Sequence, residues 1–333
     1  MELVNNTPFV ADRFAMRDTE DADVLVIVVK CTYDLRAGLP LTVSEEQSPI
    51  QMADEFWGNA GETSVRYESD LAPTKTGTDV VLHGHAYAAQ GQAHWVEVSL
   101  RVGTIGKTIS VFGNRQWVNG LSGPQISAPE PFDRMPLVYE LAYGGSDVSS
   151  PEPEGEERNP VGRGFRAKKS HQDLNGMALP NLEDPMALIR HPSDRPAPAG
   201  FGFFGRHWLP RRGLAGTFDQ AWTENRSPFL PGDFSEDYFN GGSPGLVARP
   251  HLLGHEPVEI INASVVSPLR FQLPGTQLEV RTLVEDFPFT VGMRFDTLVI
   301  EPDLERLMMV WRGVQPVQGR LEKVEGIEVS TKT

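Results

Sequence analysis

Residues 159–165 read NPVGRGF, residues 179–185 read LPNLEDP and residues 216–222 read GTFDQAW, within a stretch rich in glycine and proline that runs from Glu156 to Leu253. This stretch has no clear period-2 or period-3.6 hydrophobicity, which by itself is typical of a linker. Its large aromatic side chains include Trp208, Phe218, Trp222, Phe229, Phe234, Tyr238 and Phe239. Disordered linkers are poor in such residues, because each offers a large apolar area to bury. We therefore expect an ordered irregular segment, laid over a sheet scaffold.

The chain before this central segment has the patterns of β-strands. Asp23–Tyr33 reads DVLVIVVKCTY, a β-branched run that predicts a central strand buried on both faces. Val80–Ala88 and His94–Val102 alternate on either side of Gln90-Gly91-Gln92, which predicts a hairpin. The first 145 residues are therefore expected to be mainly antiparallel β.

Further elements follow from the same patterns. The other predicted strands are Ile105–Val118 with a break at Gly113-Asn114, Leu137–Tyr143 closed by Gly144-Gly145, Val258–Ala263, Leu278–Thr282, Phe295–Ile300 and Arg306–Val314. The last four are expected to form a meander, followed by Val317–Val329 as an edge strand or tail. Asp219–Asn225 predicts a short helix with Thr217 as N-cap, and Glu45–Phe56 fits either a short helix or a strand edge.

The sequence thus predicts a mainly β protein of antiparallel, sandwich-like sheets, with a long ordered irregular central segment and few short helices. We expect three regions, residues 1–145, 146–255 and 256–333, within one integrated unit.

Composition excludes several classes of function. The 30 Lys and Arg against 45 Asp and Glu give a net charge of -15, which repels phosphate backbones and predicts no nucleic-acid binding. We find no signal-peptide pattern at Met1 and no long apolar run, so no membrane partner is expected. The only cysteine, Cys31, cannot form an internal disulfide, which favours the cytoplasm as the location.

Three histidines are candidate metal ligands. His83 and His85 share one face of a predicted strand, and His94 lies across the expected hairpin turn. No Cys, Asp or Glu nearby completes a tetrahedral set, so we favour ordinary histidines of a strand face. The sequence predicts no metal ion and no cofactor.

Catalytic and phosphate-binding patterns are weak. Gly162-Arg163-Gly164 lacks the strand before it and the capped helix after it that a phosphate cradle needs, so we expect a tight arch with positive φ at both glycines and Arg163 bonded to carbonyls or a carboxylate. No Gly-x-Ser-x-Gly motif is present, and Cys31 lies in a predicted core strand. The acidic pairs Glu183-Asp184 and Asp233 with Glu236 favour turn formation over acid–base catalysis.

A cluster of anchor residues lies within twelve positions of the central segment. The candidate partner-binding residues are Phe201, Phe203, Phe204, Arg206, Trp208, Arg211 and Arg212. Aromatic and arginine side chains of this kind dominate binding energy in protein interfaces. Each group also has an alternative to partner binding. Phe201 and Trp208 would fill the core instead, and the arginines would tie the segment to acidic loops of the same chain.

Several motifs resemble the DUF2169 family. They are TDVVLHGHAY at 78–87, VFGNRQW at 111–117, PFDRMPL at 131–137, YGG at 143–145, NPVGRGF, LPNLEDP, PAGFG at 198–202, GTFDQAW, LPGDF at 230–234 and FQLP at 271–274. They occur in the family's order over about residues 1–315. Two loops depart from the family pattern, at Gly241–Gly245 and at Gly200–Phe204. These departures leave open which partner protein the chain binds.

The resemblance implies a bacterial, non-enzymatic adaptor or chaperone. Proteins of this family are encoded beside type VI secretion spike components, so the implied partners are a toxin effector and the VgrG and PAAR proteins of the spike. The family supplies no catalytic residues. Two alternatives remain. One is a hydrolase-like enzyme that uses His83, His85 and the His, Asp and Arg residues of the central segment. The other is a structural component of the spike or baseplate.

Overall fold

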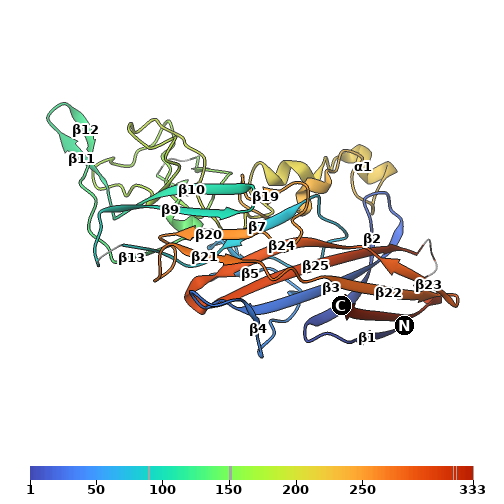
Figure 1. The fold of residues 1–333 in the computed structure, drawn as a ribbon. Coiled ribbons are helices and arrows are strands. Elements are labelled where there is room, and N and C mark those ends of the chain that lie inside the picture. Colours follow the sequence, from blue (N-terminus) through green and yellow to red (C-terminus); the bar gives the residue numbers. More distant parts are fainter. Residues whose placement is uncertain (89–90, 150–151, 318, 320, 333) are drawn as a thin grey trace.

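The computed structural model describes residues 1–88, 91–149, 152–317, 319 and 321–332 (Figure 1). Its largest sheet has seven strands. In spatial order they are β19 (Val247–Ala248), β7 (Thr78–Leu82), β24 (Met293–Glu301), β25 (Arg306–Pro316), β3 (Asp23–Asp34) and β2 (Val10–Arg17), with β4 (Thr42–Val43) paired to β3. All neighbours are antiparallel except β24 and β7, which run parallel.

Strand β3 confirms the prediction of a central strand buried on both faces. Ten of its twelve residues are buried. Leu25, Ile27 and Val29 join the main core on one face, whereas Val24 and Val26 join a second cluster on the other. Alternation of side chains across a strand makes a continuous β-branched run suitable for this position.

A five-stranded antiparallel sheet is the second large element. Its order is β18 (Leu182–Glu183), β10 (Ile105–Phe112), β9 (Trp95–Val102), β20 (Pro257–Ile261) and β21 (Leu269–Gln272). The predicted break after Phe112 is confirmed. The predicted meander is wrong except for β24 and β25, because β20 and β22 (Leu278–Val284) belong to different sheets.

The predicted hairpin of Val80–Ala88 with His94–Val102 is wrong. Gly84 has φ +156° and divides the first run into β7 and β8 (His85–Tyr87). Strand β8 pairs with β13 (Arg134–Pro136), and β9 forms its hairpin with β10. Gln90 of the expected turn lies outside the described residues.

A four-stranded sheet brings the two ends of the chain together (Figure 1). Its order is β1 (Glu2–Asn5), β26 (Val324–Thr331), β22 and β23 (Phe287–Val291). Strand β26 pairs with β1 on one side and with β22 on the other, so its prediction as an edge strand or tail is wrong. All three large sheets contribute to one main core, for example through Leu298, Leu100 and Val280.

The remaining elements are short. The two-stranded pairs are β5 (Glu55–Phe56) with β6 (Val65–Tyr67), β8 with β13, β11 (Trp117–Gly120) with β12 (Gly123–Ile126), β14 (Tyr143–Gly144) with β17 (Arg163–Gly164), and β15 (Ser146–Asp147) with β16 (Glu154–Gly155). The helices are η1 (Tyr139–Leu141), η2 (Arg211–Ala215), α1 (Gln220–Asn225), η3 (Glu236–Phe239), η4 (Pro302–Leu304) and η5 (Leu321–Lys323). Of the expected strand Leu137–Tyr143, only Tyr143 lies in a strand and Tyr139–Leu141 form a 3₁₀ turn, and of Glu45–Phe56 only the last two residues form a strand.

Helix α1 begins one residue later than expected, and its N-cap differs. The carboxylate of Asp219 accepts a hydrogen bond from the Trp222 amide at 2.8 Å, as an N-cap does. Thr217 instead donates its amide and hydroxyl to Asp233. The fold class is confirmed: the protein is mainly β, with an ordered irregular central segment and few short helices.

Positive φ was predicted for both glycines of the arch at 162–164, and it is found at Gly164 only. Gly164 has φ +89°, the left-handed region that favours glycine. Gly162 lies outside that region, but a Cβ there would stand 2.6 Å from the Ala142 carbonyl oxygen and 2.8 Å from the Cα of Gly144. Close backbone approach, and not φ, therefore requires glycine at 162. Arg163 donates to the Glu140 carbonyl as predicted, at 3.1 Å.

The close approach at Gly162 predicts that replacing glycine by alanine lowers the stability more at position 162 than at position 213. Gly162→Ala should lower the free energy of unfolding by about 1–3 kcal/mol, because backbone atoms must move to admit the methyl group. Gly213→Ala is the matched control, since a Cβ there meets nothing within 4 Å, and its effect should be about 0.5 kcal/mol or less. Urea denaturation measures both, and equal stabilities would contradict the close contact.

Candidate functional site

The predicted partner-binding aromatics lie inside the protein. Phe201 is 0% exposed, Phe203 3%, Phe204 4% and Trp208 7%. Tyr139, Phe204 and Trp208 pack edge to face, with ring centroids 5.3–5.6 Å apart. In this conformation a partner cannot reach these side chains, and their role is to fix the central segment to the core.

The three predicted arginines bind acidic residues of the same chain. Arg211 is buried and donates to Glu68 at 2.5 Å and to the Phe204 carbonyl at 2.7 Å. Arg206 also donates to Glu68, at 2.8 Å. Arg212 pairs with Glu157 at 2.7 Å, with half of its side chain exposed. Only Arg206 and Arg212 of the seven candidates present partly exposed side chains.

A buried ion pair fixes the end of the central segment to β7. Lys75 Nζ lies 2.8 Å from the carboxylate of Asp79, and it also donates to Thr297 on β24. The same carboxylate accepts hydrogen bonds from the Asn240 side chain and the Gly241 amide, at 3.0 and 2.8 Å. Burial opposes the charged form, yet Lys75 and the two donors hold the pKa of Asp79 below its ordinary value.

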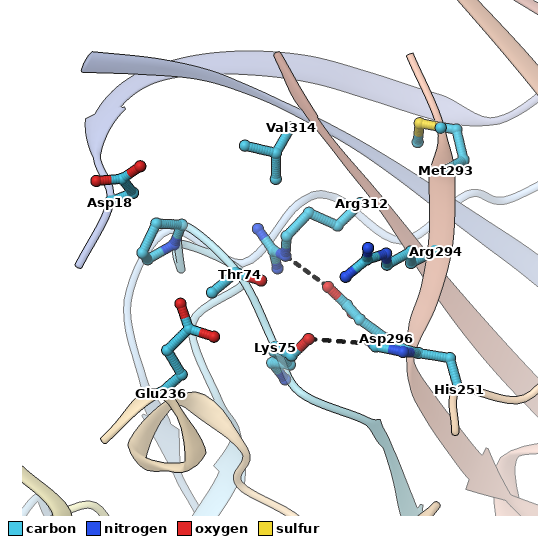
Figure 2. Close-up of a pocket in the computed structure, with 12 residues that line it drawn as sticks. Asp18, Thr74, Lys75, Glu236, His251, Met293, Arg294, Asp296, Arg312 and Val314 are labelled. Carbon is cyan, nitrogen blue, oxygen red and sulfur yellow. Dashed lines mark hydrogen bonds and ion pairs between the residues drawn. The ribbon is translucent and has the colours of Figure 1, made fainter. Parts of the chain in front are cut away.

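Lys75 also lines a polar pocket of about 540 Å³, shown in Figure 2. We call it the charged pocket. Its walls come from the loop before β7, from η3 and from β24 and β25, and its charged residues are Asp18, Lys75, Glu236, Arg294, Asp296 and Arg312. Here the central segment meets the seven-stranded sheet.

Asp296 forms the floor of the charged pocket. Its Oδ2 accepts from Arg312 Nε at 2.6 Å, the ion pair drawn in Figure 2. Arg312 is fixed in turn by the carbonyls of Ala72 and Asp70. Asp296 is 1% exposed, and its Oδ1 has no hydrogen-bond partner within the described part of the chain.

His251 borders the same pocket as a neutral ring. Burial, with the Arg294 guanidinium, lowers its pKa, and its Nε2 lies 3.1 Å from the Lys75 carbonyl. Arg294 is exposed and has no ion pair among the residues described. Among the described residues, the pocket therefore combines a buried carboxylate oxygen without a hydrogen-bond partner with an exposed cation that has no ion pair.

The histidines do not form a cluster around one point. His94 Nδ1 lies 2.7 Å from the Pro129 carbonyl, and His85 Nδ1 lies 2.7 Å from Asp303. His83 is buried, 3% exposed. Among the described residues, no group of three or more His, Cys, Asp or Glu side chains is arranged to hold a metal ion.

The other chemical candidates have structural partners. Burial raises the pKa of the Cys31 thiol far above its ordinary value, so it is not a nucleophile here. Glu183 pairs with Arg115, and Asp184 accepts the Met186 amide. Asp233 accepts from Thr217. These carboxylates stabilise turns and buried contacts, as their positions next to proline and glycine indicate.

One aromatic side chain that a partner can reach lies elsewhere in the central segment. Phe218 is 56% exposed and packs edge to face on Trp222, with ring centroids 4.8 Å apart. None of the residues of α1 is buried. The sequence predicts that both aromatics bury a large area, because aromatic content does not distinguish a core anchor from a surface anchor.

The fold and these contacts define a mainly β protein whose irregular central segment is fixed to the sheets by buried ion pairs. The chain belongs to the family described as "Uncharacterized protein conserved in bacteria (DUF2169)", whose family model matches residues 20–312. No curated protein and no solved structure matches it. Within the described residues, we find no helix with both the length and the apolar character needed to cross a membrane.

Coupling between Lys75 and Asp79 can be measured directly. Lys75→Met or Asp79→Asn alone should lower the free energy of unfolding by about 3–5 kcal/mol, because each leaves an uncompensated buried charge. The double variant should lose clearly less than the sum of the two single effects. Denaturation of the four proteins gives the coupling energy, and strict additivity would show that the pair is not a unit.

The same pair predicts a pH dependence. The folded-state pKa of Asp79 lies below the unfolded value of about 4, so its stabilising effect is fully present above pH ~4 and is lost as the pH falls through the folded-state pKa. Between pH 5 and pH 2 the wild type should therefore lose more stability than the double variant, which lacks this titration. Identical pH profiles in urea denaturation would contradict the lowered pKa.

Proposed function

We propose that this protein is a non-enzymatic adaptor that binds a type VI secretion toxin and helps to load it onto the VgrG and PAAR spike. Membership of the DUF2169 family and the sequence resemblance described above support this proposal. Loading precedes secretion, so we place the protein in the bacterial cytoplasm. It acts by binding, and its partners are the toxin and the spike proteins.

The observation that carries the proposal is the exposed Phe218, which packs on the partly buried Trp222 of α1. Exposed aromatic side chains with polar surroundings are typical of protein interfaces. The polar surroundings here include Gln220 and Glu224, which hydrogen-bond to each other at 2.7 Å. We call α1 with Phe218 the aromatic platform.

The platform is held rigidly although it buries little. Trp222 Nε1 donates to the Phe229 carbonyl at 2.8 Å, and Arg226 pairs with Asp21 at 2.7 Å. The guanidinium of Arg17 on β2 lies 5.1 Å from the centroid of the Phe229 ring. A preordered surface loses little conformational entropy on binding, so a small number of anchors is enough for a reversible interface.

Binding of the toxin should depend on Phe218. Phe218→Ala should weaken co-elution with the toxin encoded beside this gene by about tenfold or more, since a truncated aromatic hot spot costs about 2 kcal/mol or more. Its melting temperature should be unchanged, because the side chain is exposed. Quantitative pull-down with purified proteins measures the loss.

Leu121→Ala is the matched control. Leu121 is fully exposed on the β11–β12 hairpin, at the other end of the molecule from α1 (Figure 1). It should bind the toxin as the wild type does. Undiminished binding by a folded Phe218→Ala protein would place the interface elsewhere, and recovery of the protein in the secreted particle would identify it as a spike component.

A further inference from the structure

Strand β2 is an open end of the largest sheet (Figure 1). Among the described residues its only strand neighbour is β3, with which all eight of its residues pair in continuous register. The strand reads VADRFAMR and contains neither a proline nor a bulge, two devices by which edge strands avoid pairing with other chains. Its outer edge therefore has the geometry of a template for a further strand.

The other edge strands of the large sheets are shorter or interrupted by proline. Strands β18 and β19 have two residues each, and β1 and β21 have four each. Strand β21 also lies between Pro268 and Pro274, and the five residues of β23 include Pro288. Within the described part of the chain, β2 is thus the longest regular edge in these sheets.

The hydrogen-bond pattern shows which main-chain groups of β2 face outward. The Asp18 amide donates to the Ala22 carbonyl at 3.0 Å, and on the far side of β3 the Val317 amide donates to the Asp23 carbonyl at 3.1 Å. Hydrogen-bonded and non-hydrogen-bonded pairs alternate along an antiparallel ladder. Residues 10, 12, 14 and 16 therefore bond to β3, and the residues that direct their N–H and C=O groups to the open edge are Ala11, Arg13, Ala15 and Arg17.

Most of these outward groups have no partner in the chain. Within the described residues, neither the amides nor the carbonyls of Ala11, Ala15 and Arg17 take part in a hydrogen bond. The Arg13 amide donates to the carboxylate of its neighbour Asp12 at 2.8 Å. A row of this kind can be completed by a strand of another molecule.

The side chains of β2 favour a second copy of the same strand in that place. If two β2 strands pair antiparallel with Phe14 opposite Phe14, Arg13 lies opposite Ala15 and Arg17 lies opposite Ala11. Every outward residue then meets an outward residue, as a hydrogen-bonded pair requires. Each arginine faces an alanine, so no like charges lie opposite each other.

Other registers lack this match. Sliding one strand by two residues places Arg13 opposite Arg13 in one direction and opposite Arg17 in the other, and like charges directly opposite each other destabilise paired strands. Sliding by a single residue brings groups that already bond to β3 to the new interface. The strand is therefore self-complementary in one register, which is what a twofold-symmetric interface needs.

Phe14 is the residue on the symmetry axis of this register. It is partly buried and packs against the second cluster, which includes Val24 and Val26. In a non-hydrogen-bonded pair the side chains approach most closely, so the two Phe14 rings would contact each other and join the second clusters of the two copies.

We propose that this protein forms a symmetric dimer in which the β2 strands of two copies pair antiparallel about Phe14. Local charges are balanced, because Arg13 pairs with Asp12 at 3.0 Å and Arg17 lies 3.6 Å from Asp23. The net charge of -15 on each chain opposes association, so the dimer is reversible and strengthens with salt. The dimer goes beyond the adaptor role and does not rest on it.

The first test measures the mass against protein concentration by analytical ultracentrifugation. The wild type should change from one chain to two over the micromolar range. Ala15→Arg places a charge opposite Arg13 of the other copy and should weaken the dimer about fivefold, since this contact occurs twice. Ala15→Glu is the matched variant of opposite charge and should strengthen the dimer about fivefold. Ala15 is exposed, so both variants should melt as the wild type does.

A second test traps the register. In a non-hydrogen-bonded pair the Cα atoms lie about 4.5 Å apart, within the range of a disulfide. Phe14→Cys should therefore give a disulfide-linked dimer under mild oxidation. Met16→Cys is the matched control on the same face of the strand, but its two copies would lie about 13 Å apart and should not be linked. The native Cys31 is buried and should not react.

Four outcomes would overturn the proposal. They are the mass of one chain at every concentration up to about 0.5 mM, equal effects of the two folded Ala15 variants, equal linkage of Phe14→Cys and Met16→Cys, and protection of the β2 amides from hydrogen exchange by the toxin or a spike protein in place of a second copy. The first three are measured without the toxin, so their results do not depend on the proposed adaptor role.

Discussion

The buried ion pair of Lys75 and Asp79 is the contact on which the arrangement of this protein depends. It joins β7 to β24 through Thr297, and it joins β7 to the central segment through Asn240 and Gly241. Irregular backbone cannot satisfy its own polar groups as a helix or sheet does, so fixed side-chain partners must replace the missing ladder. A hydrophobic contact of equal size would stabilise the fold as well, but it would not specify one position of the segment.

Glu68 repeats this solution, because it accepts hydrogen bonds from Arg206 and Arg211 of the central segment. Arg211 also donates to the carbonyls of Phe204 and Tyr238. The buried pair of Asp296 and Arg312 instead joins β24 to β25 and, through the Ala72 and Asp70 carbonyls, to the loop before β7. The central segment is thus fixed at several points although it lacks regular secondary structure, and α1 and Phe218 lie on the outside.

The sequence predicted the class of the fold but not its connections. Strand β3 was predictable because a β-branched run buried on both faces has few alternatives. The partners of β7 were not, because adjacency along the chain favoured a local hairpin of Val80–Ala88 with His94–Val102, whereas β7 pairs with β24, where Thr297 lies opposite Asp79, and with β19. The site shows the same limit. Phe204 and Phe218 are equally good anchors by sequence, but one is 4% exposed and the other 56%, and the partner of Arg206 is 138 positions away.

Placing the aromatic platform outside the core has a physical consequence for an adaptor. Because α1 contributes no buried residue, contact with a partner there does not disturb the packing of the sheets. The buried clamps at Asp79 and Glu68 keep the rest of the segment in place, so binding requires little ordering and release requires no rearrangement of the core. Under the proposed adaptor role, a toxin bound at this surface would be released at a rate set by the interface alone, which is the property that separates an adaptor from a permanent subunit.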